Sequence, residues 1–266
     1  MRIKITLLSI LVIFIATSCS NNNFDYPETK KVNIVDNYFG KEVPDPYRWL
    51  ENDTSQAVEN WVQKQNEVTF NYLGQIPYRS KIKSRLKEIW NYKKVSTPQQ
   101  NNGKYFYFKN DGLQDQSVLY MAEELGGEEK VVLDPNTFSE DGTIALANYK
   151  VSRDGKYIAY AISKGGSDWQ EIHIKNLDTG KELDDHLKWV KFSNIAWYKN
   201  GFFYSRYAAP AEGEELSQIN KNHKIYYHEL NTDQEQDELV FNKPQYPKRN
   251  YQADVSRDEK YLYIYE

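Results

Sequence analysis

Nucleophilic catalysis and metal binding are the two kinds of chemistry for which the sequence offers candidate residues. A catalytic serine in an α/β-hydrolase sits in a G-x-S-x-G turn, and the nearest match, Gly165-Gly166-Ser167-Asp168-Trp169, lacks the final glycine. The four histidines stand at positions 173, 186, 223 and 228, without the spacing of a helical metal pair. We expect surface or rim positions for all four. The sequence therefore predicts no catalytic residue, no metal site and no cofactor.

The single cysteine, Cys19, follows a basic start and an apolar run, and precedes the polar segment Ser20-Asn21-Asn22-Asn23. Residues 1–19 form a secretory signal that is too short to span a bilayer comfortably. A cysteine where small residues end resembles a lipoprotein signal cleaved before Cys19, whose thiol would carry diacylglycerol. An ordinary signal peptide with an incidental cysteine is the alternative. In either case we expect export, to the periplasm or to a membrane reached only through the lipid anchor.

The composition favours a folded, aromatic-rich protein. The chain has 266 residues, a net charge of −4, a mean hydropathy of −0.81 and 15% aromatic residues, of which 22 are tyrosines. Aromatic rings with a polar tip suit sheets packed face to face, because the hydroxyl can reach the rim. No basic stripe stands out, so we expect no nucleic-acid partner.

Residues 20–92 predict a flexible tether and then a helical segment. Prolines 44 and 46 make the stretch from Asp45 to Glu51 extended. A helix with 3.6-residue periodicity then follows cap candidates 53–55 and ends at Gly74, and a second one runs from near Ser80 to Trp90. Two amphipathic helices need a partner surface, and nothing in the strand-rich remainder is suited to receive them.

A repeated turn-strand pattern organises residues 93–266. Val151-Ser152-Arg153-Asp154-Gly155-Lys156-Tyr157 recurs as Val255-Ser256-Arg257-Asp258-Glu259-Lys260-Tyr261, with looser copies at 102–108 and 200–204. A period of roughly 50 residues with several short strands per unit is typical of β-propeller blades. Strands are predicted at 104–109, 117–122, 129–133, 144–149, 156–162, 170–176, 189–192, 195–198, 202–207, 224–230, 238–241 and 260–265. The segment then holds about three and a half blades of four-stranded antiparallel sheet.

The final residues, Tyr261 to Glu266, fall inside an apparent strand. Known propeller rings use at least four blades, so we expect the chain to be the front part of a longer protein. A small ring closed by a natural terminus is the alternative.

Seven stretches, in register, resemble the prolyl oligopeptidases, serine peptidases of the S9A type. They are Asp45-Pro46-Tyr47-Arg48-Trp49-Leu50-Glu51, Gly112-Leu113-Gln114, Leu133-Asp134-Pro135-Asn136, Asp141-Gly142-Thr143, Val151-Ser152-Arg153-Asp154-Gly155, Gly166-Ser167-Asp168-Trp169, and Lys191-Phe192-Ser193 with Ala196-Trp197. The resemblance implies a seven-bladed propeller that covers the active site of an α/β-hydrolase domain. It also implies that residues 20–92 are the N-terminal piece of that hydrolase domain, most of which comes from later in the chain.

Two residues gain a role through the resemblance alone. Asp168 matches a propeller residue that pairs with an arginine of the hydrolase domain near the substrate cleft; satisfying a turn after Gly166 is its alternative role. Phe192 matches an aromatic residue that lines the cleft, and a place in the blade core is its alternative.

The resemblance implies an exported serine endopeptidase that hydrolyses short peptides after proline, with the propeller gating access. The Ser-Asp-His triad would lie in the hydrolase domain, so residues 1–266 alone should be inactive. An S9 enzyme with a preference for basic residues shares the fold and the chemistry. A non-catalytic propeller lipoprotein that binds a partner is the competing interpretation.

Overall fold

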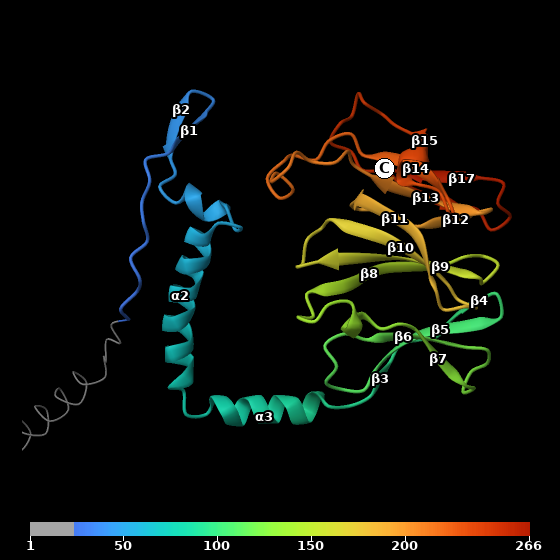
Figure 1. Cartoon of the computed structure of the whole chain (residues 1–266), viewed down its shortest axis with the longest axis horizontal. Helices are drawn as coiled ribbons and strands as arrows, with labels where there is room; N and C mark the ends of the chain where they lie inside the picture. The colour runs from blue at the N-terminus through green and yellow to red at the C-terminus, as the bar shows by residue number, and fades with distance from the viewer. Residues whose placement is uncertain (1–23) are drawn as a thin grey trace, which may run out of the picture. The chain divides into compact units, whose positions relative to one another are not determined.

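The computed structural model describes residues 24–266, so the predicted signal and Cys19 lie outside the described residues. The chain divides into two compact units, the first ending at Leu86 and the second running from Lys87 to Glu266 (Figure 1). Within residues 24–266, no helix has both the length and the apolar character needed to cross a membrane.

The first unit opens with a hairpin that the sequence analysis did not predict. Strands β1 (Val35–Tyr38) and β2 (Lys41–Pro44) pair antiparallel, and the 3₁₀ helix η1 (Arg48–Glu51) follows. The prediction of an extended stretch was therefore wrong for residues 48–51. The Arg48 guanidinium binds the carboxylates of Asp36 and Asp45, which joins the turn to the hairpin.

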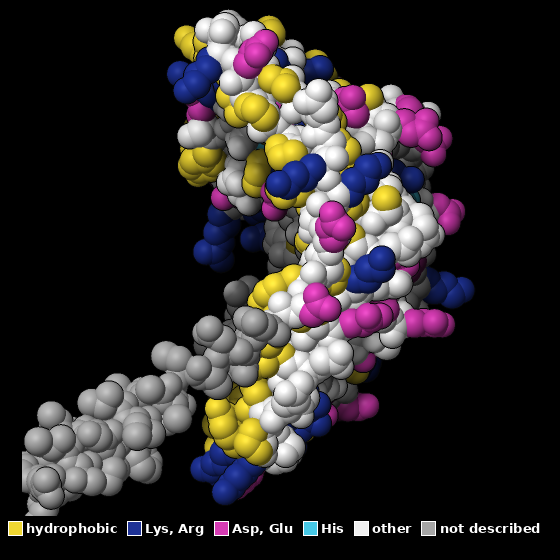
Figure 2. Space-filling view, turned by 90° about the vertical axis from the view of Figure 1, so that its left-hand side faces the viewer, with side chains coloured by type: hydrophobic (Ala, Val, Ile, Leu, Met, Phe, Trp, Pro, Cys, Tyr) yellow, Lys and Arg dark blue, Asp and Glu magenta, His cyan; other side chains and the backbone are white. Residues whose placement is uncertain are grey.

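The two predicted helices are confirmed as α2 (Gln56–Gly74) and α3 (Arg79–Trp90). Ser55 caps α2 by accepting a hydrogen bond from the Val58 amide at 3.3 Å. In these two helices, which the structure describes completely, Val58 is the one buried residue. Figure 2 shows hydrophobic side chains on the surface of this unit, and large exposed ones on the helices are Val62, Phe70, Tyr72, Ile82, Leu86, Ile89 and Trp90. These residues belong to the apolar stripes that the sequence predicted for the two helices.

The second unit consists of antiparallel blades. Blade 1 contains β3 (Lys94–Val95) and β4 (Gln99–Asn101), which both pair with β5 (Lys104–Asn110), followed by β6 (Val118–Ala122) and β7 (Glu129–Leu133). Blade 2 contains β8 (Ile144–Val151), β9 (Tyr157–Lys164), β10 (Gln170–Asn176) and β11 (Glu182–Val190). Blade 3 contains β12 (Ala196–Tyr198), β13 (Gly201–Arg206), β14 (Lys224–Glu229) and β15 (Glu238–Phe241). Strands β16 (Gln252–Val255) and β17 (Leu262–Tyr265) form the opening of blade 4. Three complete blades and part of a fourth confirm the predicted partial propeller.

Alternate residues along each inner strand pack against different neighbours. In β9, Ile158, Tyr160 and Ile162 join a core with blade 1, whereas Ala159 and Ala161 join a core with blade 3. The same alternation continues in blade 3. There Phe202 and Tyr204 face blade 2, and Phe203 packs with Tyr251, Ala253 and Val255 of the blade 4 segment. A strand buried on both faces has no polar face to show, which explains its continuous apolar sequence.

The repeated turn joins the first and second strands of blades 2 and 4, and its hydrogen bonds are the same in both blades. Ser152 Oγ donates to Asp154 Oδ1 at 2.7 Å and accepts from the Tyr157 amide at 2.9 Å. Ser256 makes the corresponding bonds with Asp258 and Tyr261, at 2.7 and 3.0 Å. Glycine 155 has a φ of 71°, and its counterpart, Glu259, has a φ of 59°. A glutamate in this left-handed region is strained, so a contact of its side chain is needed to offset the strain.

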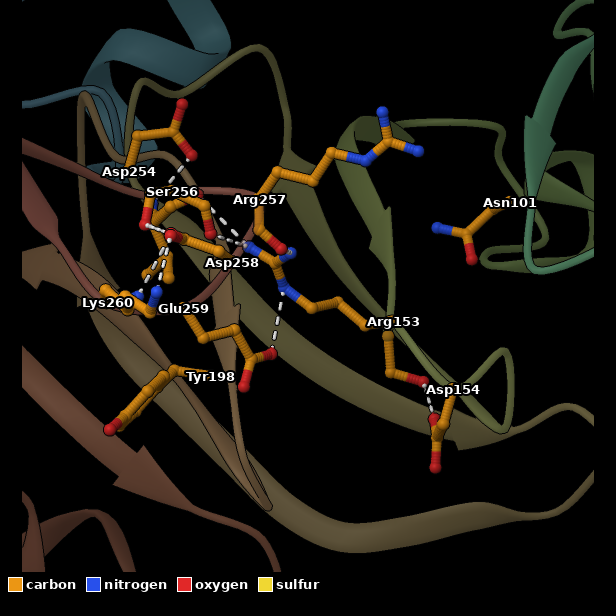
Figure 3. Close-up of polar contacts among 12 residues, drawn as sticks. Asn101, Arg153, Asp154, Tyr198, Asp254, Ser256, Arg257, Asp258, Glu259 and Lys260 are labelled. Atoms are coloured by element: carbon orange, nitrogen blue, oxygen red, sulfur yellow. Dashed lines mark hydrogen bonds and ion pairs between the residues drawn. The ribbon is translucent and has the colours of Figure 1, made fainter.

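Arg153 supplies that contact by reaching from the turn of blade 2 to the turn of blade 4 (Figure 3). Its guanidinium donates to the carbonyl oxygens of Val255, Ser256 and Arg257 at 2.8–3.1 Å, and its Nε lies 3.1 Å from Glu259 Oε1. The Ser-Arg-Asp repeat therefore sets the spacing between blades as well as the turn within each blade.

Two histidines correct the expectation that all four lie at the surface. His223 and His228 are both fully buried. His228 lies between two buried carboxylates, with Nε2 2.9 Å from Asp185 Oδ1 and Nδ1 2.7 Å from Asp237 Oδ1. Asp185 belongs to β11 in blade 2, so this network joins the outer strands of blades 2 and 3. Burial alone would lower the pKa of His228, but the hydrogen bonds to Asp185 and Asp237 outweigh it and raise that pKa to about 9.

This raised pKa predicts a loss of stability at alkaline pH. The stabilisation is complete below the ordinary pKa of 6.5 and is lost as pH rises through about 9. His228→Gln should lower the free energy of unfolding at neutral pH by about 3 kcal/mol, because it leaves buried carboxylates without their cation. The difference in free energy between wild type and variant should shrink between pH 7 and pH 10 in urea titrations. Asp184→Asn, at the exposed carboxylate next to Asp185, is the control, and parallel wild-type and His228→Gln curves would refute the assignment.

Candidate functional site

The two ends of the blades carry different kinds of connections. The outer pairs of strands alternate direction, so the connections 111–117, 134–143, 165–169, 191–195, 207–223 and 242–251 all emerge at one end, called the loop face here. The other end, the turn face, carries tight turns such as 102–103 and 199–200. At Gly201, next to one of these turns, an added Cβ would lie 2.1 Å from the His228 carbonyl oxygen. Because binding residues concentrate on long loops held by a rigid scaffold, the loop face is the candidate site.

Both residues singled out by the family resemblance lie on the loop face and share a neighbour. Asp168 lies in connection 165–169 and Phe192 in connection 191–195, and both side chains are exposed. The Lys191 ammonium is 3.6 Å from Asp168 Oδ2 and 5.6 Å from the centre of the Phe192 ring. We call Asp168, Trp169, Lys191 and Phe192 the Lys191 cluster. It places one anion, one cation and one exposed ring together on the loop face.

Trp169 anchors this cluster to the longest connection. Its Nε1 donates to the Glu215 carbonyl oxygen at 2.7 Å, and its ring packs edge-on against Trp189 and Tyr207 with centroids 5.6 and 6.0 Å away. The Lys191 ammonium lies 4.9 Å from the centre of the Trp169 ring. Residues 207–223 are therefore held beside Asp168 by an aromatic cluster.

The backbone around Phe192 is fixed by hydrogen bonds although the ring is free. The His223 Nδ1 accepts from the Tyr251 amide at 2.9 Å, so Nε2 carries the proton and donates to the Lys191 carbonyl oxygen at 2.8 Å. Burial lowers the pKa of His223, and the Lys191 carbonyl opposes this only in part, so His223 is neutral at pH 7. Gln252 donates to the Phe192 carbonyl at 3.3 Å. Phe192 itself has a φ of 55°, which is a strained conformation, and the residue is half-exposed.

Two kinds of cavity accompany this surface. One of about 220 Å³ lies beside Trp169 and is also lined by Trp189, Lys188, Glu215 and Glu171. Others, of about 590, 300 and 200 Å³, follow the innermost strands, and Lys150 lines all three. Their further polar residues include Gln99, Gln100, Asn101, Asn148, Asn194, Arg153, Asp254 and Arg257. The inner wall of the arc is thus polar, although it does not contain the Lys191 cluster.

The sequence analysis placed Asp168 and Phe192 separately, and the structure brings them together through Lys191. Lys191 belongs to the Lys191-Phe192-Ser193 stretch. The sequence analysis did not predict that Lys191 also lies beside a second aromatic residue, Trp169. The alternative for Phe192, a place in the blade core, is wrong because 45% of its surface is exposed. Asp168 makes no turn-capping bond that would favour its alternative role over a surface role; the Ser167 hydroxyl accepts from the Trp169 amide instead. Whether either residue meets substrate stays a prediction.

The repeated four-stranded blades and a loop-rich face define the class of protein, a β-propeller of the kind that presents loops from one end. Residues 26–266 match the family model described as prolyl oligopeptidase, N-terminal beta-propeller domain. The chain therefore belongs to the prolyl oligopeptidase family, of which it contains the N-terminal propeller region.

Relatives in bacteria and fungi agree with this family. The prolyl endopeptidases of Elizabethkingia miricola and Elizabethkingia meningoseptica are each 49% identical over 94% of this chain, which covers 36% of their length. The dual function macrocyclase-peptidase POPB of Galerina marginata is 35% identical over 91% of this chain, which covers 37% of its length. The chain thus spans little more than a third of the curated relatives it matches.

Solved structures show the same fold. Prolyl oligopeptidase B from Galerina marginata, bound to a 35mer hydrolysis and macrocyclization substrate, matches with a TM-score of 0.75 and 34% identity over 91% of this chain and 37% of its own. A chain from a structural and mechanistic analysis of two prolyl endopeptidases matches with a TM-score of 0.60 and 38% identity, over 90% of this chain and 34% of its own.

The strained and exposed Phe192 predicts that this residue can be replaced without loss of thermal stability. Phe192→Gly should leave the thermal midpoint unchanged or slightly raised, because relief of about 1 kcal/mol of backbone strain offsets the loss of a half-exposed ring. Trp189 also has a positive φ, of 60°, but its ring packs against Trp169. The matched variant Trp189→Gly should lower the thermal midpoint, as calorimetry or thermal fluorescence would show. A Phe192→Gly protein that melts well below wild type would mean that the ring has a structural role.

Proposed function

We propose that this chain is the N-terminal part of a prolyl-oligopeptidase-like serine endopeptidase that hydrolyses short peptides after proline. The observation that carries the proposal is the Lys191 cluster on the loop face of a propeller that is 49% identical to prolyl endopeptidases. The triad would be supplied by an α/β-hydrolase domain encoded beyond Glu266, forming an acyl-enzyme with an oxyanion hole.

The exposed helices α2 and α3 support a missing hydrolase domain as partner. Their large apolar side chains, such as Phe70, Ile82 and Trp90, are more than 50% exposed. Contiguous apolar surface of this kind marks an interface. A hydrolase domain would cover these stripes and leave the charged face of each helix in water.

The loop face would then close over the cleft. Asp168 offers a carboxylate for an arginine of the hydrolase domain, and Phe192 offers a ring to an apolar part of the peptide. The polar inner wall around Lys150 would border a water-filled path whose width admits short peptides and excludes folded proteins. These are the roles of Asp168 and Phe192 in our proposal.

The expected result in a peptidase assay differs between the short and the long protein. Residues 20–266 alone should not cleave a proline-containing chromogenic peptide, whereas the product of the coding sequence read past codon 266 should cleave it. In the active protein, Asp168→Asn should raise KM roughly tenfold, as the loss of one charged hydrogen bond would. Asp178→Asn, on the turn face of the same blade, is the matched control.

Turnover by residues 20–266 alone would overturn the proposal. A gene product that ends at Glu266, folds stably and binds a partner without turnover would instead establish the non-catalytic propeller lipoprotein. Equal KM values for Asp168→Asn and Asp178→Asn would remove Asp168 from the cleft while leaving the peptidase assignment intact.

We further propose export and lipidation at Cys19, on the strength of the signal-like start of the sequence. Native cells fed a labelled fatty acid should label the wild-type protein, and Cys19→Ser should abolish the label. A labelled Cys19→Ser protein, or an unlabelled wild type, would contradict lipidation; retention of the full signal in the cytoplasm would contradict export.

A further inference from the structure

Three side chains with metal-ligating atoms converge on strands β10 and β11 of blade 2. Glu171 and His173 lie two apart on β10 and therefore share a face of the strand. His186 on β11 is the direct cross-strand partner of His173. One ligand atom from each of the three lies within 4.8 Å of the other two. Such a convergence of imidazole and carboxylate groups is the donor set of many zinc sites.

One ring nitrogen of His173, Nε2, is buried and unpaired within the described part of the chain. Its Nε2 meets no hydrogen-bond partner among residues 24–266. Its ring is held between those of Tyr160 and His186, with centroids 5.7 and 4.6 Å away, so it cannot turn freely to find one. A buried polar atom without a partner needs an explanation, and an absent ligand is one.

The distances fit a small ion. Glu171 Oε2 lies 2.8 Å from His186 Nε2 and 3.9 Å from His173 Nε2. Ligands of a tetrahedral ion, each about 2.0–2.1 Å from it, lie roughly 3.4 Å from one another. The Glu171 carboxylate and the His186 ring, both partly exposed, would have to turn so that all three ligand atoms meet one ion beside the fixed His173 ring. An interruption of the β10–β11 register next to His173 helps to aim the side chains, as bulges do.

We propose that Glu171, His173 and His186 form a binding site for a divalent transition-metal ion that fastens β10 to β11. Two imidazoles and one carboxylate suit Zn²⁺ and Cu²⁺ better than the hard cations Mg²⁺ and Ca²⁺. A solvent molecule would complete the coordination. The expectation of no metal site rested on the spacing of His223 and His228, and a cross-strand pair 13 positions apart escapes that test.

Lys164 is the group that competes with the ion. Its ammonium lies 2.8 and 2.9 Å from the two carboxylate oxygens of Glu171. The His186 ring lies 2.8 Å from the same carboxylate, so an entering ion would have to displace the Lys164 ammonium from Glu171. The Lys164 side chain is 55% exposed and can move into water when an ion enters.

The test uses the full chain with Cu²⁺ and Zn²⁺ alone as probes. Electron paramagnetic resonance of one equivalent of Cu²⁺ should show two imidazole nitrogens, and one after either His173→Ala or His186→Gln. Zinc titration calorimetry should show affinity weakened about tenfold or more by either variant or by Glu171→Gln. Lys164→Met should tighten binding, because it removes the competing cation, and Asp178→Asn in the same hairpin should have no effect.

The opposite results are equally clear. Unchanged Zn²⁺ affinity in His186→Gln and Glu171→Gln, both at partly exposed positions that tolerate substitution, would overturn the proposal even if His173→Ala fails to fold. A Cu²⁺ spectrum without imidazole nitrogens in the wild type would do the same. Weaker binding in Lys164→Met would show that the ion does not enter beside Glu171.

Discussion

The requirement that both faces of every blade be buried governs this structure. A four-stranded sheet with apolar residues on both faces has no stable surface in water, so each blade depends on a neighbour on either side. Blades 2 and 3 have two neighbours within residues 24–266, and their inner residues, such as Ile158 and Phe202, are fully buried. The end blades have one neighbour each, and Val131 of blade 1 and Tyr261 of blade 4 are 56% and 62% exposed. The arc thus has a stable middle and two apolar ends.

Polar ties add the register that apolar packing alone does not specify. Arg153 fixes the turn of blade 4 against that of blade 2, and the Asp185–His228–Asp237 network fixes the outer strands of blades 2 and 3. Both ties are charged and directional, and each joins groups far apart in the sequence. Apolar surfaces tolerate sliding, whereas directional hydrogen bonds to a charged group do not. One tie lies at the inner turns and the other at the outer strands, so together they resist rotation of one blade on the next.

The sequence predicted the turns and helices, because they depend on contacts between residues close together in the chain. The Ser-Arg-Asp turn revealed the blade repeat because its hydrogen bonds all close within six residues. The helices followed from 3.6-residue periodicity with a Ser55 cap and a Gly74 end. The prediction for β11 was wrong because 189–192 was taken for a strand that runs from Glu182 to Val190. Its charged stretch looks like a loop, but Asp185 is buried by His228, 43 positions away. The role of Lys191 likewise depends on a contact that is distant in sequence, with Asp168. The hairpin β1–β2 was missed although its strands are neighbours in sequence.

The same constraint decides where functional side chains can stand. Inner-strand positions are occupied by the cores between blades, so exposed chemistry is left to the strand ends and to the outer strands. Asp168 and Phe192, which we propose for the cleft, lie in connections at the strand ends, where Phe192 has a positive φ. The proposed metal ligands lie on the outer strands β10 and β11. There the core with blade 1 ends at Tyr160 and Phe138. Exposed residues at either place, such as Asp168 and His186, lie outside the blade cores. The propeller can therefore keep one scaffold while its loop face and outer strands acquire different chemistry.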